Sequence, residues 1–285
     1  MKLGCSTVLF NQLDLYGALQ HISWAGYQGA DVSDIILARH IRMDSGKSNI
    51  YEVEYAARKH GLELFSIDTE DQGRTEEDKI KSMAKVFNIA QKLSIPVVAP
   101  YLHGKSGREG EKRNIEYIRK LSEQAASRGV MMAIKVHVGT PIDKAATLIQ
   151  ILDEIDSPGL GAAIDTRELC RAGDDIFETI SKINKRIVHV HLRDYPGREQ
   201  MPADISPTYS ATFGQWEPWR PSVEQQIPGR GGLDFPNIFK CLKNVGYDKA
   251  VDLVITGAFT YPLSRQMAIA GEARGYLNRC LQELK

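Results

Sequence analysis

The chain has 285 residues, of which 42% are hydrophobic and 25% are charged, a composition typical of a soluble globular protein. Lysine plus arginine equal aspartate plus glutamate at 36 each, so charge gives no reason to expect nucleic acid or a membrane surface as a partner. The N-terminus lacks a signal-peptide pattern, no run reaches the roughly 18 apolar residues of a membrane span, and four scattered cysteines favour a reduced, cytoplasmic protein.

Short apolar strand candidates alternate with amphipathic helix candidates along the whole chain. We expect strands at 2–6, 29–34, 62–67, 95–101, 129–137, 160–165, 186–192 and 249–255, and helices at 13–25, 49–60, 75–93, 109–128, 141–155, 174–182, from about 234, and 264–284. Eight such units without a linker-like change in composition predict a single (β/α)₈ barrel domain over residues 1–285. A doubly wound sheet, the alternative, would favour a glycine-rich phosphate turn after the first strand, and CSTVLFNQ is not one.

One connection is unusually long. Residues 194–232 separate the seventh strand from the next helix, and loops beyond roughly 15 residues are usually functional or disordered. The segment is rich in aromatic residues, which argues against a disordered spacer. We expect it at the carboxyl end of the barrel as a lid or a subunit contact, with Trp216 as a candidate substrate-binding residue.

Barrel enzymes place their chemistry at the carboxyl ends of the strands. The ends of the second to eighth strands offer the following candidates: Asp31, Asp68, His103, Lys135, His137, Asp165, Glu168, His191, Arg193 and Asp252. Arg193 and Arg230 flank the long loop, where an arginine is either solvated or binds a phosphate or carboxylate.

Asp165 and His191, on neighbouring strands, offer an oxygen and a nitrogen ligand, a mixture that suits manganese, zinc or a magnesium-like ion. Two ligands do not complete a metal site. The fifth and eighth strands would have to supply the others, and they offer Lys135 and Val254. A lysine ammonium cannot ligate a cation and repels it.

Several stretches together resemble the xylose-isomerase-like barrels, which comprise sugar (phosphate) isomerases and epimerases and belong with the AP endonuclease family 2. They are GYQGADV at 26–32, IDTRE at 164–168, HVHLRD at 189–194 and PGRGGLDFPNIFKCLKNVGYDKAVDLV at 228–254. The resemblance covers nearly the whole chain. It implies a (β/α)₈ fold and a manganese, magnesium or cobalt ion held by Glu, Asp, His and Glu on the fifth to eighth strands.

Laid on this chain, the resemblance keeps the family's aspartate as Asp165 and its histidine as His191. Lys135 and Val254 stand where the family has its two glutamates, which also act as its acid/base pair, and Glu168 replaces a further histidine. The resemblance therefore implies a degenerate metal site. Either no cofactor or an atypically bound divalent metal (Mn, Mg, Co or Zn) is expected.

The residues leave several roles open. Lys135 forms an ion pair with Asp165, acts as a base or Schiff-base nucleophile, or turns out toward solvent. Asp165 and His191 form either a hydrogen-bonded polar core or a metal site completed by Glu168 or Asp252. His189 is interpreted as a core histidine, and His137 either contacts substrate or is structural.

The first functional hypothesis is an enzyme that transfers a proton next to the carbonyl of a sugar, polyol or related compound, by isomerisation, epimerisation or β-elimination. Lys135, Glu168 and His137 are the candidate proton carriers, and Lys135 is also a candidate for polarising the carbonyl. Candidate substrate-binding residues are Asp31, Asp68, His103, Arg193, Arg230 and Trp216.

The alternative is a non-catalytic or accessory barrel that binds a sugar-like ligand or a partner subunit, as in complexes that cleave carbon-linked glycosides. We expect a homo-oligomer, with a hetero-oligomer as the second option. An endonuclease is disfavoured because the chain is neutral rather than basic.

Overall fold

The computed structural model describes residues 1–41, 47–103, 108–197, 199, 201, 208–210, 215–217 and 221–284. For residues 47–49, 108–111, 208–210 and 215–217 it describes the backbone alone.

Eight parallel strands close into a barrel, because β1 pairs with both β2 and β11 and each remaining strand pairs with the next. The strands are β1 (Lys2–Ser6), β2 (Gly29–Ile35), β4 (Glu63–Glu70), β5 (Val97–Tyr101), β6 (Met131–Ile134), β7 (Leu160–Asp165), β8 (Ile187–Leu192) and β11 (Ala250–Leu253). A short strand, β3 (Ala38–Arg39), runs antiparallel to β2. The predicted (β/α)₈ barrel is confirmed.

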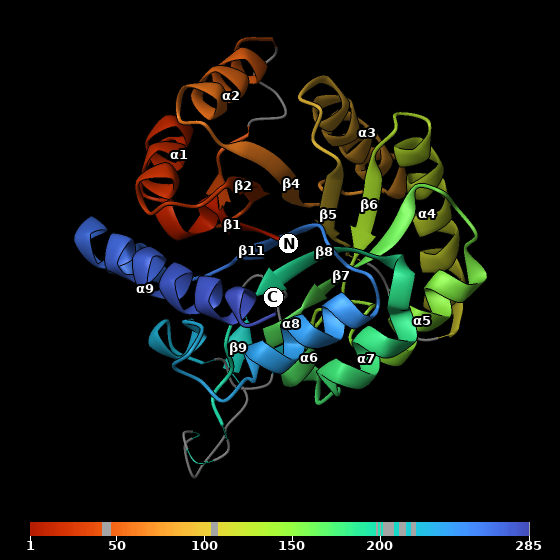
Figure 1. Cartoon of the computed structure of the whole chain (residues 1–285). Helices are drawn as coiled ribbons and strands as arrows, with labels where there is room; N and C mark the ends of the chain where they lie inside the picture. The colour runs from red at the N-terminus through yellow and green to blue at the C-terminus, as the bar shows by residue number, and fades with distance from the viewer. Residues whose placement is uncertain are drawn as a thin grey trace.

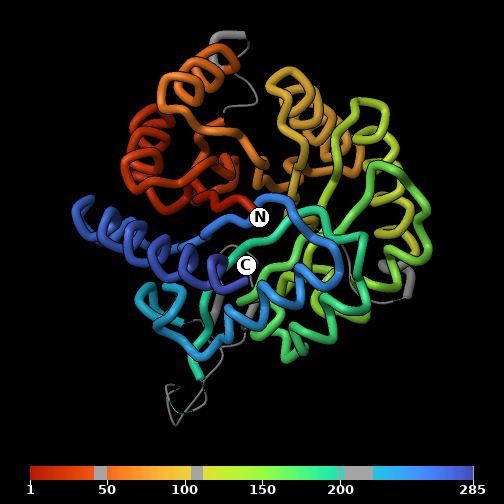
Figure 2. Tube along the Cα trace, viewed as in Figure 1, coloured from red at the N-terminus to blue at the C-terminus, as the bar shows by residue number. Residues whose placement is uncertain are grey.

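Helices surround the strands as an outer ring (Figure 1). They are α1 (Leu15–Trp24), α2 (Lys47–Lys59), α3 (Glu76–Lys92), α4 (Arg108–Ala126), α5 (Ala145–Glu154), α6 (Thr166–Ala172), α7 (Ile176–Ile183), α8 (Phe235–Asn244) and α9 (Leu263–Gln282). The chain passes once around the barrel, so its first and last segments lie side by side in Figure 2. No helix within the described ranges is long and apolar enough to cross a membrane.

Helix α6 is absent from the sequence prediction because no loop precedes it. Asp165 is at once the last residue of β7 and the N-cap of α6, where its carboxylate accepts a hydrogen bond from the Glu168 backbone N–H at 3.2 Å. Gly173, with φ of 74°, ends the helix in a left-handed conformation. The short helix places three charged side chains, Arg167, Glu168 and Arg171, at the mouth of the barrel.

Two strands differ from their predicted bounds where the site begins. The predicted fifth strand extends to residue 137, whereas β6 ends at Ile134, so Lys135 and His137 lie just beyond it. The predicted third strand stops at 67, whereas β4 continues to Glu70. Within the long connection, β9 (Thr208–Ser210) and β10 (Gln215–Glu217) form an antiparallel pair. The backbone of Trp216 belongs to β10, but its side chain lies outside the described atoms.

The barrel interior changes from apolar to polar along its axis. Small and branched side chains of β5 to β8 pack together in one cluster, namely Val97, Ala99, Ala133, Ala163 and Val188. Gly4 allows Asp252 to enter the interior, since a Cβ at Gly4 would lie 1.8 Å from Asp252 Oδ1. Charged and polar side chains fill the interior toward the carboxyl ends, where the predicted site residues lie.

Candidate functional site

A pocket with a cavity volume of about 70 Å³ opens at the carboxyl end of the barrel. Its walls come from β2, β4 and β5 and from the segments that follow β6, β7, β8 and β11. Three predicted site residues line it, and Glu70, Tyr101 and Arg167 were not predicted. The lining residues are Ile35, Ile36, Leu37, Glu70, Tyr101, His103, His137, Arg167, Arg193 and Thr256.

Lys135 lies beneath the pocket and pairs with Asp68, not with Asp165 as the sequence suggested. Its Nζ is 2.6 Å from Asp68 Oδ1 and 3.9 Å from the centre of the Tyr101 ring. Asp68 is on β4, two strands away, and the β5 residue opposite it is the small Ala99. The ammonium therefore reaches across β5.

The environment of Lys135 keeps it charged. Burial opposes the charge, but Asp68, Tyr101 and Asp165 together raise the pKa of Lys135 above its ordinary value. A lysine that holds its proton so firmly is a poor general base or Schiff-base nucleophile. Its contribution is a fixed positive charge.

Arg193 forms the ion pair with Asp165 that the sequence analysis expected of Lys135. Its Nε is 3.1 Å from Asp165 Oδ1, and its Nη2 bonds Asp165 Oδ2, so the carboxylate is held on two atoms. Thr166 fixes the backbone here, because its hydroxyl donates to the Arg193 carbonyl at 2.6 Å. The arginine is only 1% exposed, so its position is a buried pocket wall rather than a solvated surface.

Glu168 is held by two arginines. Arg167 Nη2 lies 2.7 Å from its Oε1 and Arg171 Nη1 lies 2.8 Å from its Oε2. Burial raises the pKa of the Glu168 carboxyl, but His137, Arg167 and Arg171 more than offset this and hold the pKa well below its usual range. Glu168 is therefore a permanent carboxylate at neutral pH.

His137 and Glu70 are pocket-wall groups whose proton affinity is shifted. Burial lowers the pKa of His137 to about 4, so the imidazole is neutral at pH 7. Its Nε2 lies 3.9 Å from Glu168 Oε2, and its ring meets Tyr101 edge-on at 4.8 Å. Burial raises the pKa of Glu70, although Arg39, 3.2 Å away, opposes the shift. Glu70 was missed, yet it has the strand parity of Asp68 and could have been found by extending that strand.

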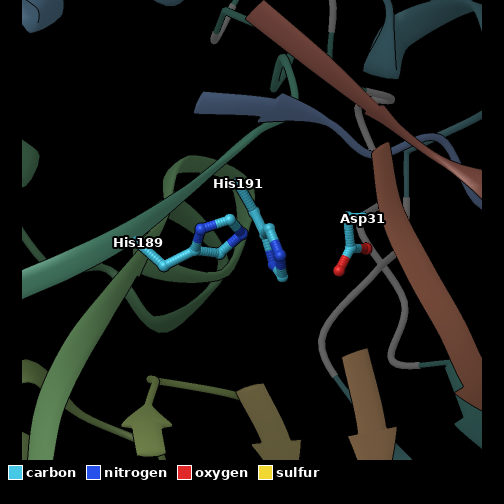
Figure 3. A group of neighbouring side chains, drawn as sticks. All are labelled: Asp31, His189 and His191. Atoms are coloured by element: carbon cyan, nitrogen blue, oxygen red, sulfur yellow. The ribbon is translucent and has the colours of Figure 1, made fainter. Parts of the chain in front are cut away.

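A second polar layer lies deeper in the barrel (Figure 3). Asp31, His189 and His191 point toward one another, with the His191 ring between the other two, and their ligand atoms lie within 4.8 Å of one another. Ser66 donates to Asp31 Oδ1 at 2.6 Å, and His189 Nε2 is 3.3 Å from Asp252 Oδ2. Among the described residues these three form a group with the donor set for a metal ion.

The charge states of this deeper layer differ from those of the pocket wall. Burial and the nearby Asp68 raise the pKa of Asp31 to about 7. Burial and Asp31 raise the pKa of Asp252 well above its ordinary value. Burial and Lys135 lower the pKa of His189 and His191, so both imidazoles are neutral. His189, interpreted as a core histidine, therefore contributes to a candidate ligand group.

The position of the family's metal does not fit a divalent cation in this chain. The Arg193 guanidinium lies on Asp165, and the Lys135 ammonium lies 3.4 Å from His191 Nδ1. Val254, at the fourth position, has a hydrocarbon side chain. Two cationic groups beside two of four ligand positions oppose a third cation there.

The remaining predicted residues differ in whether they line the pocket. Asp31 and Asp68 are buried below the pocket. His103 lines the pocket, and its Nδ1 is 2.6 Å from Asp71 Oδ1. Arg230 pairs with Glu224 and with Glu272 at 2.5 Å and is not among the pocket-lining residues. Substrate contact by Asp31, Asp68, Arg230 or Trp216 stays a prediction.

Comparison with known proteins gives relatives of low identity but long overlap. The chain is 23% identical over 242 residues to the inosose dehydratase of Clostridium perfringens (strain ATCC 13124), covering 81% of this chain and 78% of that protein. It spans about half the length of several other curated relatives that it matches.

Two solved structures share the fold over nearly all of the chain. The IolI protein with a bound zinc atom has a TM-score of 0.76 at 15% identity, covering 98% of this chain and 99% of that one. D-psicose 3-epimerase of Clostridium cellulolyticum H10, solved with D-tagatose, has a TM-score of 0.76 at 14% identity, covering 99% of each chain. A family model matches residues 19–277. This chain belongs to the xylose isomerase-like TIM barrel family.

Proposed function

We propose that this protein is an enzyme that removes and returns a proton on the carbon next to the carbonyl of a sugar or cyclitol ketone. The names of its relatives, an inosose dehydratase and ketose epimerases, support this reaction class. The observation that carries the proposal is that Arg193 pairs with Asp165, and Lys135 with Asp68, beside the pocket at the carboxyl end of the barrel.

The positive charge of these two side chains takes over the electrostatic work of a metal. When the proton leaves carbon, the electron pair moves onto the carbonyl oxygen, and a nearby cation stabilises the resulting enolate. Arg193 lines the pocket and is placed to donate to that oxygen. Lys135 lies behind the Tyr101 ring and adds a fixed charge from beneath.

His137 and Glu70 are the proposed proton carriers. His137 is neutral at pH 7, and Glu168 at 3.9 Å stabilises the imidazolium that forms when it accepts the proton. Glu70, whose pKa is raised, lines the same pocket. Return of the proton to the opposite face gives epimerisation. If the second carrier instead protonates a β-hydroxyl, water leaves and the product is an unsaturated ketone.

The roles of Lys135 and Glu168 change accordingly. Both were candidate proton carriers, and the proposal keeps them as permanent charges that position Asp68 and His137. The degenerate metal site remains part of the proposal, with no step that passes through a metal. The group Asp31, His189 and His191 is separate from this chemistry.

Deuterium exchange tests the proposed reaction. The protein, dialysed against a chelator, is incubated in D₂O with an inosose and with a panel of ketoses, and NMR follows deuterium at the carbon next to the carbonyl. We expect incorporation that His137→Gln and Glu70→Gln each reduce by about 100-fold or more, the usual range for a lost general base. Exchange that requires added metal, or that both variants retain in full, would contradict the proposal.

A further inference from the structure

We propose that His103, oriented by Asp71, is a further catalytic residue, and that it protonates the hydroxyl that leaves when this enzyme removes water from its substrate. The substrate is then a ketone with a hydroxyl on the carbon beyond the one that loses its proton. This inference rests on the proposed function. It assigns the loss of water to a group other than the two that serve carbon.

Asp71 is a buried carboxylate on which four donors converge. Its Oδ1 lies 3.0 Å from the His103 backbone nitrogen and 2.6 Å from His103 Nδ1. Its Oδ2 lies 3.0 Å from the Tyr117 hydroxyl and 3.4 Å from Lys79 Nζ. A carboxylate only accepts hydrogen bonds, so the proton in the 2.6 Å contact belongs to Nδ1. The ring nitrogen of His103 that can exchange a proton with a ligand is therefore Nε2.

The chain places Asp71 behind the pocket wall and His103 in the wall. Glu70, the last residue of β4, lines the pocket, and successive residues of an extended chain point to opposite sides. Asp71 accordingly contacts Lys79 of α3 and Tyr117 of α4. Lys79 also donates to the His103 carbonyl at 2.7 Å. His103 is thus held through its backbone N–H, its carbonyl and its ring.

His103 lies between two cavities. It lines the candidate pocket and also a second cavity of about 230 Å³, which Lys79 and Tyr117 line as well. Its side chain is 36% exposed, whereas that of His137 is 9% exposed. An acid must regain a proton from solvent after each turnover. His103 has the access that this step requires.

Glu70 and His103 belong to the same side of the pocket. Burial raises the pKa of the Glu70 carboxyl, and the charges of Arg39 and His103 oppose this shift, so the His103 ring is close enough to act on Glu70. His137 follows β6 and meets the ring of Tyr101 edge-on. A ligand whose carbon lies between His137 and Glu70 therefore presents a neighbouring oxygen to His103.

The proposed step balances without a co-reactant. His137 takes the proton from the carbon next to the carbonyl, and the electron pair of that C–H bond passes through the enolate into a double bond to the next carbon. The C–O bond on that next carbon breaks with its electron pair on oxygen. This oxygen takes the proton from His103 Nε2 and leaves as water, and Asp71 stabilises the imidazolium until then. Exchange of one proton with solvent at each histidine restores the starting state.

Loss of water is measured beside deuterium exchange, with the inosose or ketose that exchanges fastest. NMR in D₂O follows the exchange, and the absorbance of the conjugated carbonyl follows the unsaturated product. We expect the wild-type protein to give both signals. His103→Ala should lower the rate of water loss about 100-fold or more, the usual range for a lost general acid. Deuterium exchange should continue, because His137 is unchanged.

Rescue by free imidazole separates a chemical role from a structural one. His103→Ala leaves a space beside the second cavity, and added imidazole should restore part of the lost rate. In Asp71→Asn the amide can turn an N–H toward Nδ1 and impose the other tautomer, so water loss should fall while exchange continues, without rescue by imidazole. His60→Gln changes a histidine that packs against Tyr16 outside the pocket lining, and this matched control should behave like the wild type.

The two proposals fail in different ways. Absence of exchange in the wild-type protein would refute the proton transfer and this inference with it. Exchange without an unsaturated product would overturn the role of His103 alone. The same conclusion would follow if His103→Ala kept its rate of water loss, lost exchange to the same extent, or gained nothing from imidazole. If circular dichroism shows that His103→Ala does not fold, His103→Gln, whose amide can still donate to Asp71, gives the same comparison of water loss with exchange.

Discussion

Replacing Lys135 by methionine keeps a long side chain but removes the ammonium that lies 2.6 Å from Asp68 Oδ1. The two side chains are 1% and 2% exposed, so the variant leaves a buried carboxylate without its partner. Breaking a buried ion pair from one side costs about 3–5 kcal/mol. Because a domain is stable by about 5–15 kcal/mol, we expect a large loss in the free energy of unfolding.

A double-mutant cycle identifies the partner. Lys135→Met combined with Asp68→Asn removes both charges, and we expect it to recover most of the lost stability. Lys135→Met combined with Asp165→Asn should be at least as unstable as the single variant, because Asp165 pairs with Arg193. Urea denaturation at pH 7 with a chelator present, followed by circular dichroism, measures each free energy.

The pH dependence gives an independent check. The charge of Lys135 lowers the pKa of Asp68, whereas burial raises it, so removing Lys135 raises that pKa further. A carboxyl whose pKa is higher in the folded state than in the unfolded state favours folding at low pH, where it is protonated. This stability is lost as the pH rises through the folded-state pKa. The deficit of Lys135→Met should therefore shrink as the pH falls from 7 toward 4.5. The Lys135–Asp68 pairing would be refuted if adding Asp165→Asn restored the stability of Lys135→Met. It would also be refuted if Lys135→Met lowered the free energy of unfolding by less than about 1 kcal/mol.

Other predictions concern one group each. His137 has its pKa lowered from 6.5 to about 4, so stability falls as the pH drops through this range, by at most about 3 kcal/mol; His137→Gln should flatten that loss in urea titrations. Gly4→Ala should destabilise strongly because its Cβ would meet Asp252 Oδ1 at 1.8 Å. Gly271→Ala, on α9 with no atom within 4 Å of the added Cβ, should stabilise by up to about 1 kcal/mol in thermal denaturation. Chelator treatment should leave deuterium exchange unchanged, and a rate restored only by added manganese or zinc would be the opposite result.

The fold could be predicted because its signal is periodic and repeated. Eight strand–helix alternations specify a barrel even when individual bounds shift by a few residues. The errors gather at the carboxyl ends of the strands. There, β4 continues through Asp68 to Glu70, and Asp165 changes from strand to helix cap within one residue. Because polar residues follow the apolar part of each strand, a prediction based on hydrophobicity ends the strand where the site residues begin.

The partner of Lys135 could not be predicted from the sequence because Lys135 and Arg193 compete for the same carboxylate, that of Asp165. The sequence correctly places Asp165 beside His191, and the register pairs these two residues across β7 and β8. It does not show that Arg193, after the end of β8, turns into the pocket and takes Asp165 on two atoms. A guanidinium binds a carboxylate more specifically than an ammonium does. Lys135 is consequently left with Asp68, across the small Ala99.

The contacts of Arg193 and Lys135 together determine what a metal ion would need in order to bind at the family's position. Restoring glutamate at positions 135 and 254 would return the family's ligands but would leave the Arg193 guanidinium on Asp165. One ligand would then be occupied and one cation would remain beside the site. A working metal position requires the arginine to leave as well. Metal binding at the family's position thus requires both glutamates and an Asp165 without a cationic partner. In this chain, fixed positive charge on Lys135 and Arg193 replaces that arrangement.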